Sequence, residues 1–233
     1  MGPTTDSEAI AERFSALAPW STRFEIGGRA FGGEIDYSAD WRIGEFFRWF
    51  REPRTILELS SFEGAHTIQL AAPEATERVV GLEGRPENVA RARLVVELLG
   101  RRNVEFAVEN LETVDLTPYG RFDAVFCAGL LYHLERPWHL LAEIARVSDQ
   151  LFLDTHYWSG SDVIEVEGHR GGWFDEGGYD DPLSGVGNRS FWLTAPALVQ
   201  LLTEAGWSIR YFNDIPDWPM APRAWVGCVR PTT

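Results

Sequence analysis

Two histidines follow the ends of predicted strands, where a proton acceptor could act on a bound molecule. His133 comes after the apolar run 122–128, and His156 follows the run 151–155, two residues beyond Asp154. Side chains two apart in an extended chain face the same side, so Asp154 and His156 are predicted to lie together. Neutral histidine can take a proton from a hydroxyl group. His133, His156 and Asp154 are therefore the candidate catalytic residues.

Each candidate also has a plain structural interpretation. His133 could order its loop by bonding the backbone, and His156 could be a solvated strand end. No Cys/His spacing indicates structural zinc, and no metal ligand is assigned. A divalent metal stays an open alternative, since oxygen and nitrogen ligands are present in a loose group: Asp154, His156, Asp175, Asp180 and Asp181.

The order of the elements that must position these residues indicates the fold class. Short apolar runs are predicted to be strands at 55–60, 78–82, 104–108, 122–128 and 151–155. Helical patterns separate them at 64–72, 86–99 and 137–147. Such alternation predicts an α/β domain, a parallel sheet with helices on both faces. A helix at 194–205 and two antiparallel strands, 207–213 and 223–229, complete it.

Two segments depart from this alternation. Residues 1–53 combine a helix at 7–17, a glycine-rich hairpin at 25–34 and a second helix from about Asp40, and we interpret them as an N-terminal lid. Residues 157–193 have no clear period and are predicted to form an irregular insertion in the main domain, 54–233. Aromatic residues are frequent in both segments, which suits a sugar or aromatic ligand.

Small and polar residues gather where three predicted strands end. The first turn runs from Glu58 to Gly64, and its small residues, such as Ser60, allow a ligand to approach the backbone. Glu83 stands 25 residues after Glu58, where an acid can accept the hydroxyl groups of a ribose. Asn110 follows the third strand, where it could meet an adenine. Ligands of open parallel sheets bind at this edge, so the sequence predicts a nucleoside site.

The first turn separates two classes of nucleoside cofactor. Dinucleotides place a pyrophosphate on a glycine-rich helix N-terminus, but this turn has Ser60, Phe62 and Glu63 at the relevant positions. A carboxylate there would repel a pyrophosphate and tolerate a cationic sulfonium. S-adenosylmethionine (SAM) is therefore favoured over a nicotinamide dinucleotide.

Four segments in order, 55–71, 79–83, 106–111 and 122–134, resemble motifs of the class I SAM-dependent methyltransferases. Ser60 and Phe62 depart from the pattern, since that family has glycines there. The resemblance implies a Rossmann-like, mostly parallel sheet of seven strands in the order 3-2-1-4-5-7-6, and SAM as cofactor. It implies these cofactor-binding residues: Glu58, Ser60, Gly64, Glu83, Gly84, Arg85, Asn110, Leu111, Cys127 and Ala128.

A narrower likeness covers 129–140 and 188–198, which are similar to enzymes that alkylate the wobble 5-oxyuridine of tRNA. The long basic N-terminal extension of those enzymes has no counterpart here. The formal net charge of −14 also disfavours nucleic acid, because phosphate binding depends on basic residues. We interpret the likeness as a shared scaffold.

Composition excludes further classes. All 21 basic residues are arginine, which excludes enzymes that need a lysine, such as pyridoxal-phosphate enzymes and P-loop NTPases. No apolar run reaches the roughly 18 residues of a membrane span, and the first residues do not resemble a signal peptide. We expect a cytoplasmic protein without a membrane partner, in which Cys127 and Cys228 are buried free thiols.

These observations predict a small-molecule O-methyltransferase, a monomer or homodimer, that acts on a sugar or natural-product hydroxyl group through a histidine base. Two alternatives stay open. The substrate could be RNA, or the chain could be a non-catalytic SAM-binding subunit of a larger enzyme.

Overall fold

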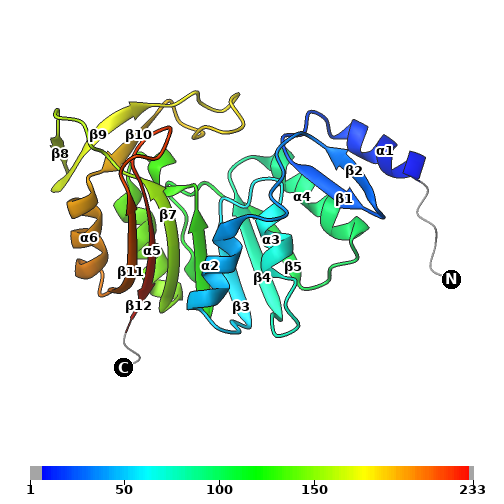
Figure 1. Ribbon diagram of the computed structural model, residues 1–233, viewed down its shortest axis with the longest axis horizontal. Helices are drawn as coiled ribbons and strands as arrows, with labels where there is room; N and C mark the ends of the chain where they lie inside the picture. Colours follow the sequence, from blue (N-terminus) through cyan, green and yellow to red (C-terminus); the bar gives the residue numbers. More distant parts are fainter. Residues whose placement is uncertain (1–6, 231–233) are drawn as a thin grey trace.

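The computed structural model describes residues 7–230 and contains a central seven-stranded sheet in the order β11-β12-β7-β6-β3-β4-β5 (Figure 1). Its strands are β3 (Thr55–Leu59), β4 (Arg78–Glu83), β5 (Val104–Val108), β6 (Ala124–Ala128), β7 (Gln150–His156), β11 (Ser208–Ile215) and β12 (Arg223–Val229). Only β12 runs antiparallel to its two neighbours; the other pairs are parallel. Numbered along the chain, this is the predicted order 3-2-1-4-5-7-6, which is confirmed.

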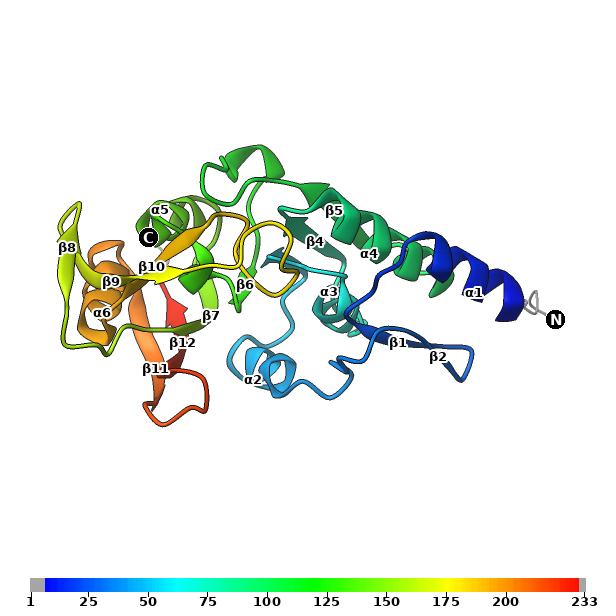
Figure 2. The same ribbon diagram turned by 90° about the horizontal axis from the view of Figure 1, so that it is seen from above.

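Helices cover both faces of this sheet, so its strands are apolar on both sides. The helices are α2 (Trp41–Trp49), α3 (Ala65–Leu70), α4 (Pro86–Leu98), α5 (Pro137–Val147) and α6 (Ala195–Glu204). Phe46 of α2 packs with Ile56 and Phe126 on one face. Leu57 and Val125, which alternate with them along β3 and β6, pack with α5 and α6 on the other face. Figure 2 shows α2 and α5 on opposite sides of the sheet.

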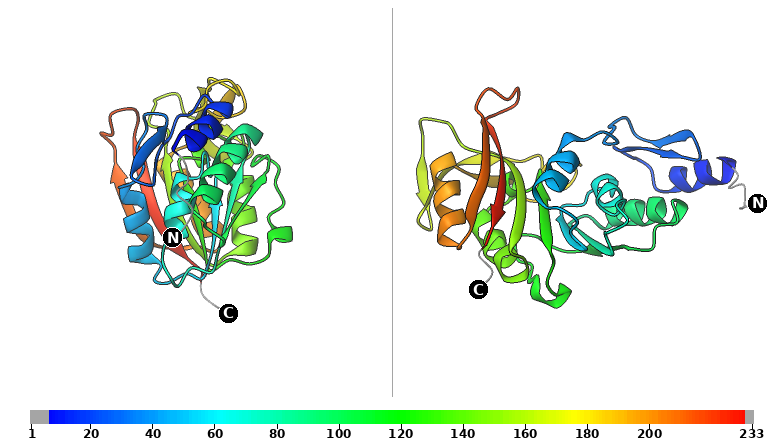
Figure 3. Two further views of the ribbon diagram at one scale, coloured as in Figure 1. Left: turned by 90° about the vertical axis from the view of Figure 1, so that its right-hand side faces the viewer. Right: turned by 60° about the horizontal axis from the view of Figure 1, so that its bottom comes forward.

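The N-terminal helix and hairpin form as predicted, as α1 (Ser7–Ala16), β1 (Arg23–Ile26) and β2 (Arg29–Gly32). Gly27 and Gly28 connect the two strands with φ of 60° and 77°, a turn that glycine adopts without strain. The unit packs on α4 at one end of the molecule, far from α6 (Figure 3). The division into 1–53 and 54–233 stays a prediction, and residues 1–6 and 231–233 lie outside the described part.

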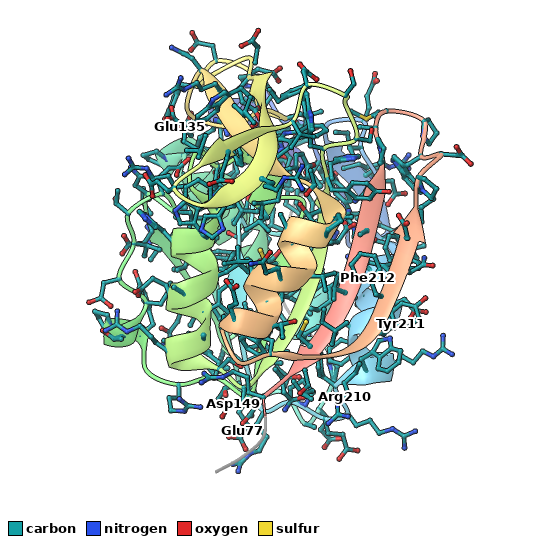
Figure 4. All side chains as sticks on the ribbon, turned by 90° about the vertical axis from the view of Figure 1, so that its left-hand side faces the viewer. Glu77, Glu135, Asp149, Arg210, Tyr211 and Phe212 are labelled. Atoms are coloured by element: carbon teal, nitrogen blue, oxygen red, sulfur yellow. The ribbon has the colours of Figure 1, made fainter. Side chains whose placement is uncertain are left out.

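The insertion at 157–193 is irregular only in part, so that prediction is wrong for its three strands. β8 (Ile164–Val166), β9 (His169–Asp175) and β10 (Arg189–Leu193) form a three-stranded antiparallel sheet. Gly171 and Gly172 conceal the strand pattern of β9 because large rings pack on its bare backbone: a Cβ at Gly172 would lie 2.2 Å from Trp158. This small sheet lies above α5 and α6, at the same end as Glu135 (Figure 4).

Two further sequence expectations can be compared with the structure. Cys127 and Cys228 are buried free thiols, as predicted. Among the helices that the structure describes, none is both long enough and apolar enough to span a membrane.

Candidate active site

A cavity opens at the carboxyl ends of β3, β4 and β6, and we call it the strand-end cavity. It has two adjoining parts that share Ser60, Glu83, Arg85, His133 and Ser184. Seven of the ten predicted cofactor-binding residues line it: Ser60, Glu83, Gly84, Arg85, Asn110, Leu111 and Ala128. The sheet reverses its strand order between β3 and β6, and ligands of such sheets bind at that point.

The first turn keeps a left-handed backbone although it has a single glycine. Ser60, Phe62 and Gly64 have φ of 64°, 50° and 88°. Gly64 is required for a second reason, because a Cβ there would lie 2.9 Å from Ala92 of α4. Gly64 therefore allows α3 to approach α4 closely, and it does not line the cavity.

Glu83 is buried and held by the backbone around it. Its carboxylate accepts hydrogen bonds from the N–H groups of Phe62 and Arg85, each at 3.0 Å, and from the Asn88 amide at 3.3 Å. Burial raises the pKa of this carboxyl group, and these hydrogen bonds oppose the shift. Its Oε2 atom accepts only from Phe62 among the described residues, so it retains capacity for a ribose hydroxyl.

Two predicted cofactor contacts lie behind the cavity wall and do not form part of it. Glu58 is buried and accepts a hydrogen bond from the Thr67 hydroxyl, and burial raises its pKa to about 8. Cys127 is also buried, which raises its pKa to about 12. Both residues sit inside parallel strands whose two faces are covered, so their side chains point into packed layers.

The charged groups of Glu63 and Arg85 bind other parts of the protein, whereas the sequence predicted that they face a ligand. Glu63 accepts from the backbone N–H groups of Ser21 and Thr22 and lies 3.6 Å from Arg91, so it anchors the N-terminal segment and does not face a ligand. Arg85 lines the strand-end cavity, but its guanidinium donates to four carbonyl groups of one loop: Gly178, Tyr179, Asp181 and Ser184. It thereby holds the loop 176–188 against the start of α4.

A second cavity, which we call the aromatic cavity, lies beside the first and has a volume of about 680 Å³. Its walls come mainly from the insertion and from the loop before β12, and they include five aromatic side chains: Tyr132, Tyr157, Trp158, Phe174 and Trp192. Pockets of ~300–1,000 Å³ enclose small molecules. The two cavities meet at Tyr132, His133, Leu183 and Ser184, which line both.

His133 is oriented by a carboxylate. Its Nδ1 atom lies 3.0 Å from Glu176, which also accepts from the Ser190 hydroxyl at 2.6 Å, the Gly185 N–H at 2.7 Å and the Ser184 hydroxyl. Burial opposes the ionisation of Glu176, but the hydrogen bonds from His133, Ser184 and Ser190 prevail and lower its pKa to about 2. An ionised Glu176 accepts the Nδ1 proton of His133, which leaves Nε2 as a proton acceptor.

His156 and Asp154 do not form the predicted pair. Asp154 is fully buried and bound by Arg223, whose Nε lies 2.6 Å away, with Arg42 at 3.4 Å. These two arginines neutralise its charge, and Asp154 lines neither cavity, so its catalytic role stays a prediction that this geometry does not support. His156 lines the aromatic cavity, and its Nδ1 lies 3.1 Å from the carbonyls of Ala221 and Pro222. Burial lowers the pKa of His156 and favours its neutral form.

The suggested metal ligands do not assemble. In residues 7–230, no group of three or more His, Cys, Asp or Glu side chains has the arrangement to hold a metal ion. Asp154 is occupied by its arginines, and His156 is bonded to backbone carbonyls.

Several residues of the site have no recognisable signal in the sequence. Glu176 is not among the predicted site residues, because nothing in the spacing links it to His133, 43 positions away. Tyr37 and Arg42 reach the strand-end cavity from the segment before and within α2. Arg42 pairs with Asp40 and Asp154, so this segment is fixed to β7 by buried charges.

Comparison with known proteins identifies the family to which the chain belongs. A family model described as "Methyltransferase domain" matches residues 57–150. The crystal structure of "the N-terminal domain of EvdMO1 in the presence of SAH and D-fucose" is 35% identical with a TM-score of 0.85, and the match covers 98% of each chain. The full EvdMO1 structure is 33% identical with a TM-score of 0.74, over 99% of this chain and 49% of that one.

The curated relatives are more distant. A "tRNA U34 carboxymethyltransferase" of Shewanella frigidimarina is 26% identical over 155 residues, which are 64% of this chain and 46% of that protein. The chain spans about half the length of the curated relatives it matches. With the strand order, the strand-end cavity and 35% identity over nearly the whole chain, these findings establish that the chain belongs to the class I SAM-dependent methyltransferases.

Proposed function

We propose that this enzyme transfers the methyl group of SAM to a hydroxyl group of a sugar, with His133 as the general base and Glu176 as its positioning residue. The observation that carries the proposal is the place of His133, which lines both cavities while Glu176 binds its Nδ1. Nε2 is then the atom available to a hydroxyl group in the aromatic cavity.

The residues of the strand-end cavity fit SAM. Glu83 offers a fixed carboxylate to the ribose hydroxyls, and Asn110 and Leu111 line the part of the cavity that suits an adenine. The Glu83 carboxylate also suits a cofactor that carries a positive charge. When bound, SAM supplies an electrophilic methyl group on a cationic sulfur atom.

The chain's own residues then have two tasks. The walls of the two cavities hold the hydroxyl oxygen in line with the methyl carbon, and orientation of this kind is worth about 7–11 kcal/mol. As the new O–C bond forms and the C–S bond breaks, with its electron pair left on sulfur, the hydroxyl proton passes to His133 Nε2. The resulting imidazolium is stabilised by the carboxylate of Glu176.

The acceptor class is supported by the walls of the aromatic cavity. Trp192 stacks on Phe174 at 4.5 Å and on His156 at 5.4 Å, so three stacked rings line one part of the cavity. Flat rings bind the C–H faces of a sugar, and nearby carboxylates such as Asp175 and Asp181 can accept its hydroxyl groups. The relative crystallised in the presence of D-fucose supports the same class.

The direct test is methyl transfer from labelled SAM to a panel of monosaccharides and methyl glycosides that includes D-fucose. We expect turnover with at least one of them. Glu176→Gln should lower kcat roughly tenfold to a hundredfold, part of the ~10²–10⁴-fold that a positioned base provides, with SAM affinity unchanged. Glu176→Asp should restore part of the loss, which a merely structural defect would not explain.

A second candidate is transfer to RNA, which the tRNA-modifying relatives favour. Methylation of tRNA transcripts, with no turnover of any sugar, would replace our proposal. SAM binding without turnover of sugar or RNA would indicate the third option, a non-catalytic subunit.

A further inference from the structure

The charges around the aromatic cavity restrict what its acceptor can carry. Asp175, Glu176 and Asp181 line it, and its described lining residues include no arginine. The sequence has no lysine that could replace one. Apart from His133 and His156, the side chains that face this cavity are therefore neutral or negative.

The arginines on the surrounding elements are engaged elsewhere. Arg223, next to the cavity residue Pro222, pairs with the buried Asp154. Arg189, at the start of β10, pairs with Glu135 at 3.3 Å and stacks over Trp173 at 4.1 Å. Arg85 donates to backbone carbonyls of the loop 176–188.

This arrangement opposes a phosphate group. Phosphates are ordinarily bound by arginine, lysine or free backbone N–H groups at helix N-termini. Here a diphosphate would lie among three carboxylates with no arginine to neutralise it. A sugar without phosphate meets no such repulsion, and its hydroxyl groups can donate to Asp175 and Asp181.

We infer that the acceptor enters without a phosphate group, as a glycoside and not as a nucleotide-activated sugar. This inference rests on the proposed function. It places methylation after a glycosyl transfer, the class of reaction in which an acceptor oxygen bonds to the anomeric carbon while the nucleoside diphosphate leaves with the electron pair. The substrate would therefore be a sugar already attached to its final acceptor.

The test offers one sugar that the enzyme methylates in three forms: its methyl glycoside, its 1-phosphate and its nucleoside diphosphate derivative. We expect kcat/KM for the glycoside to exceed that for the nucleotide sugar at least tenfold. The difference should shrink as salt screens the repulsion.

A charge-reversed variant localises the effect. Asp175 is exposed at the end of β9, and Asp175→Arg should reduce the preference for the glycoside at least threefold. Glu74→Arg changes the net charge equally and is the control, because Glu74 is exposed just before β4, at the opposite end of the sheet. Figure 4 shows that end of the molecule at Glu77, far from Glu135.

The outcomes separate the two proposals. Equal or better turnover of the nucleotide sugar would overturn this inference and leave the sugar methyltransferase intact. An equal response of both variants would also overturn it, because overall charge and not the cavity would then set the preference. No turnover of any sugar form, with SAM bound, would overturn the proposed function and this inference with it.

Discussion

The two cavities that meet at His133 are built in different ways. The strand-end cavity takes most of its residues from positions at or soon after the ends of β3, β4, β5 and β6, and adds Tyr37, Arg42 and residues 182–186 from distant segments. The aromatic cavity combines the segments 157–160, 174–192 and 220–222, which only the tertiary fold brings together. The predicted cofactor contacts therefore come mainly from short motifs, whereas the acceptor site that we propose depends on long-range packing.

The comparison implies that changes on the two sides should have separable effects. Substitutions in the strand-end cavity should alter SAM affinity, and those in the aromatic cavity should alter KM for the acceptor. His133 belongs to both and should affect the chemical step itself.

The largest effect is expected for His133→Ala. Loss of the base should lower kcat by ~10²–10⁴-fold, while the affinity for the demethylated cofactor changes only a few-fold. Steady-state kinetics and calorimetry measure the two quantities. His156→Ala is the matched control and should mainly raise acceptor KM. A larger loss of kcat in His156→Ala than in His133→Ala would indicate that His156, and not His133, is the base.

Glu83→Gln tests the cofactor side. Removal of the charged acceptor should weaken SAM binding by about 1–3 kcal/mol, the scale of charged hydrogen bonds, and leave acceptor KM unchanged at saturating SAM. Calorimetry with Glu105→Gln, an exposed carboxylate at β5, provides the control. Unaltered affinity would contradict the ribose assignment.

The buried carboxyl group of Glu58, behind the wall of the strand-end cavity, should make the stability of the fold depend on pH. Its carboxyl group holds a proton up to a pKa of about 8 in the folded chain, against 4.5 ordinarily. The folded state therefore binds the extra proton between these values, and the free energy of unfolding should fall as pH rises, by about 2 kcal/mol from pH 6 to 8. Urea unfolding of Glu58→Gln should show a flatter dependence; an identical slope would refute this assignment.

The smallest effect is expected for Phe174→Ala on the acceptor side. Loss of the ring that stacks on Trp192 should weaken acceptor binding by about 0.5–1.5 kcal/mol, which raises acceptor KM about 2- to 13-fold, and should leave SAM affinity unchanged. Val108→Ala, another exposed apolar residue, should change neither. A change of SAM affinity in Phe174→Ala would contradict the assignment of separate roles to the two cavities.

The sequence was sufficient for the parts that depend on local pattern. The parallel strands and the positions of Ser60, Glu83 and Asn110 follow from apolar runs and from the residues that end them, whereas the strand order is what the resemblance to the methyltransferases implies. The antiparallel sheet of the insertion was missed, because Gly171 and Gly172 interrupt the alternation where rings pack on the backbone.

The long-range contacts of the site could not be predicted either. No spacing rule links Glu176 to His133, or Asp154 to Arg42 at a separation of 112 residues. Such pairs exist only once the sheet has formed, so they leave no local pattern in the sequence.

The left-handed first turn has a consequence for how the protein meets its ligand. Ser60 and Phe62 accept strained backbone angles, at roughly 1–2 kcal/mol each, where glycine would be relaxed. Glycine, however, would give the unfolded chain more freedom, an opposing contribution of about 0.4–1 kcal/mol per site. The turn is therefore strained but rigid. Because its backbone has few alternative conformations, it loses less conformational entropy when a ligand binds.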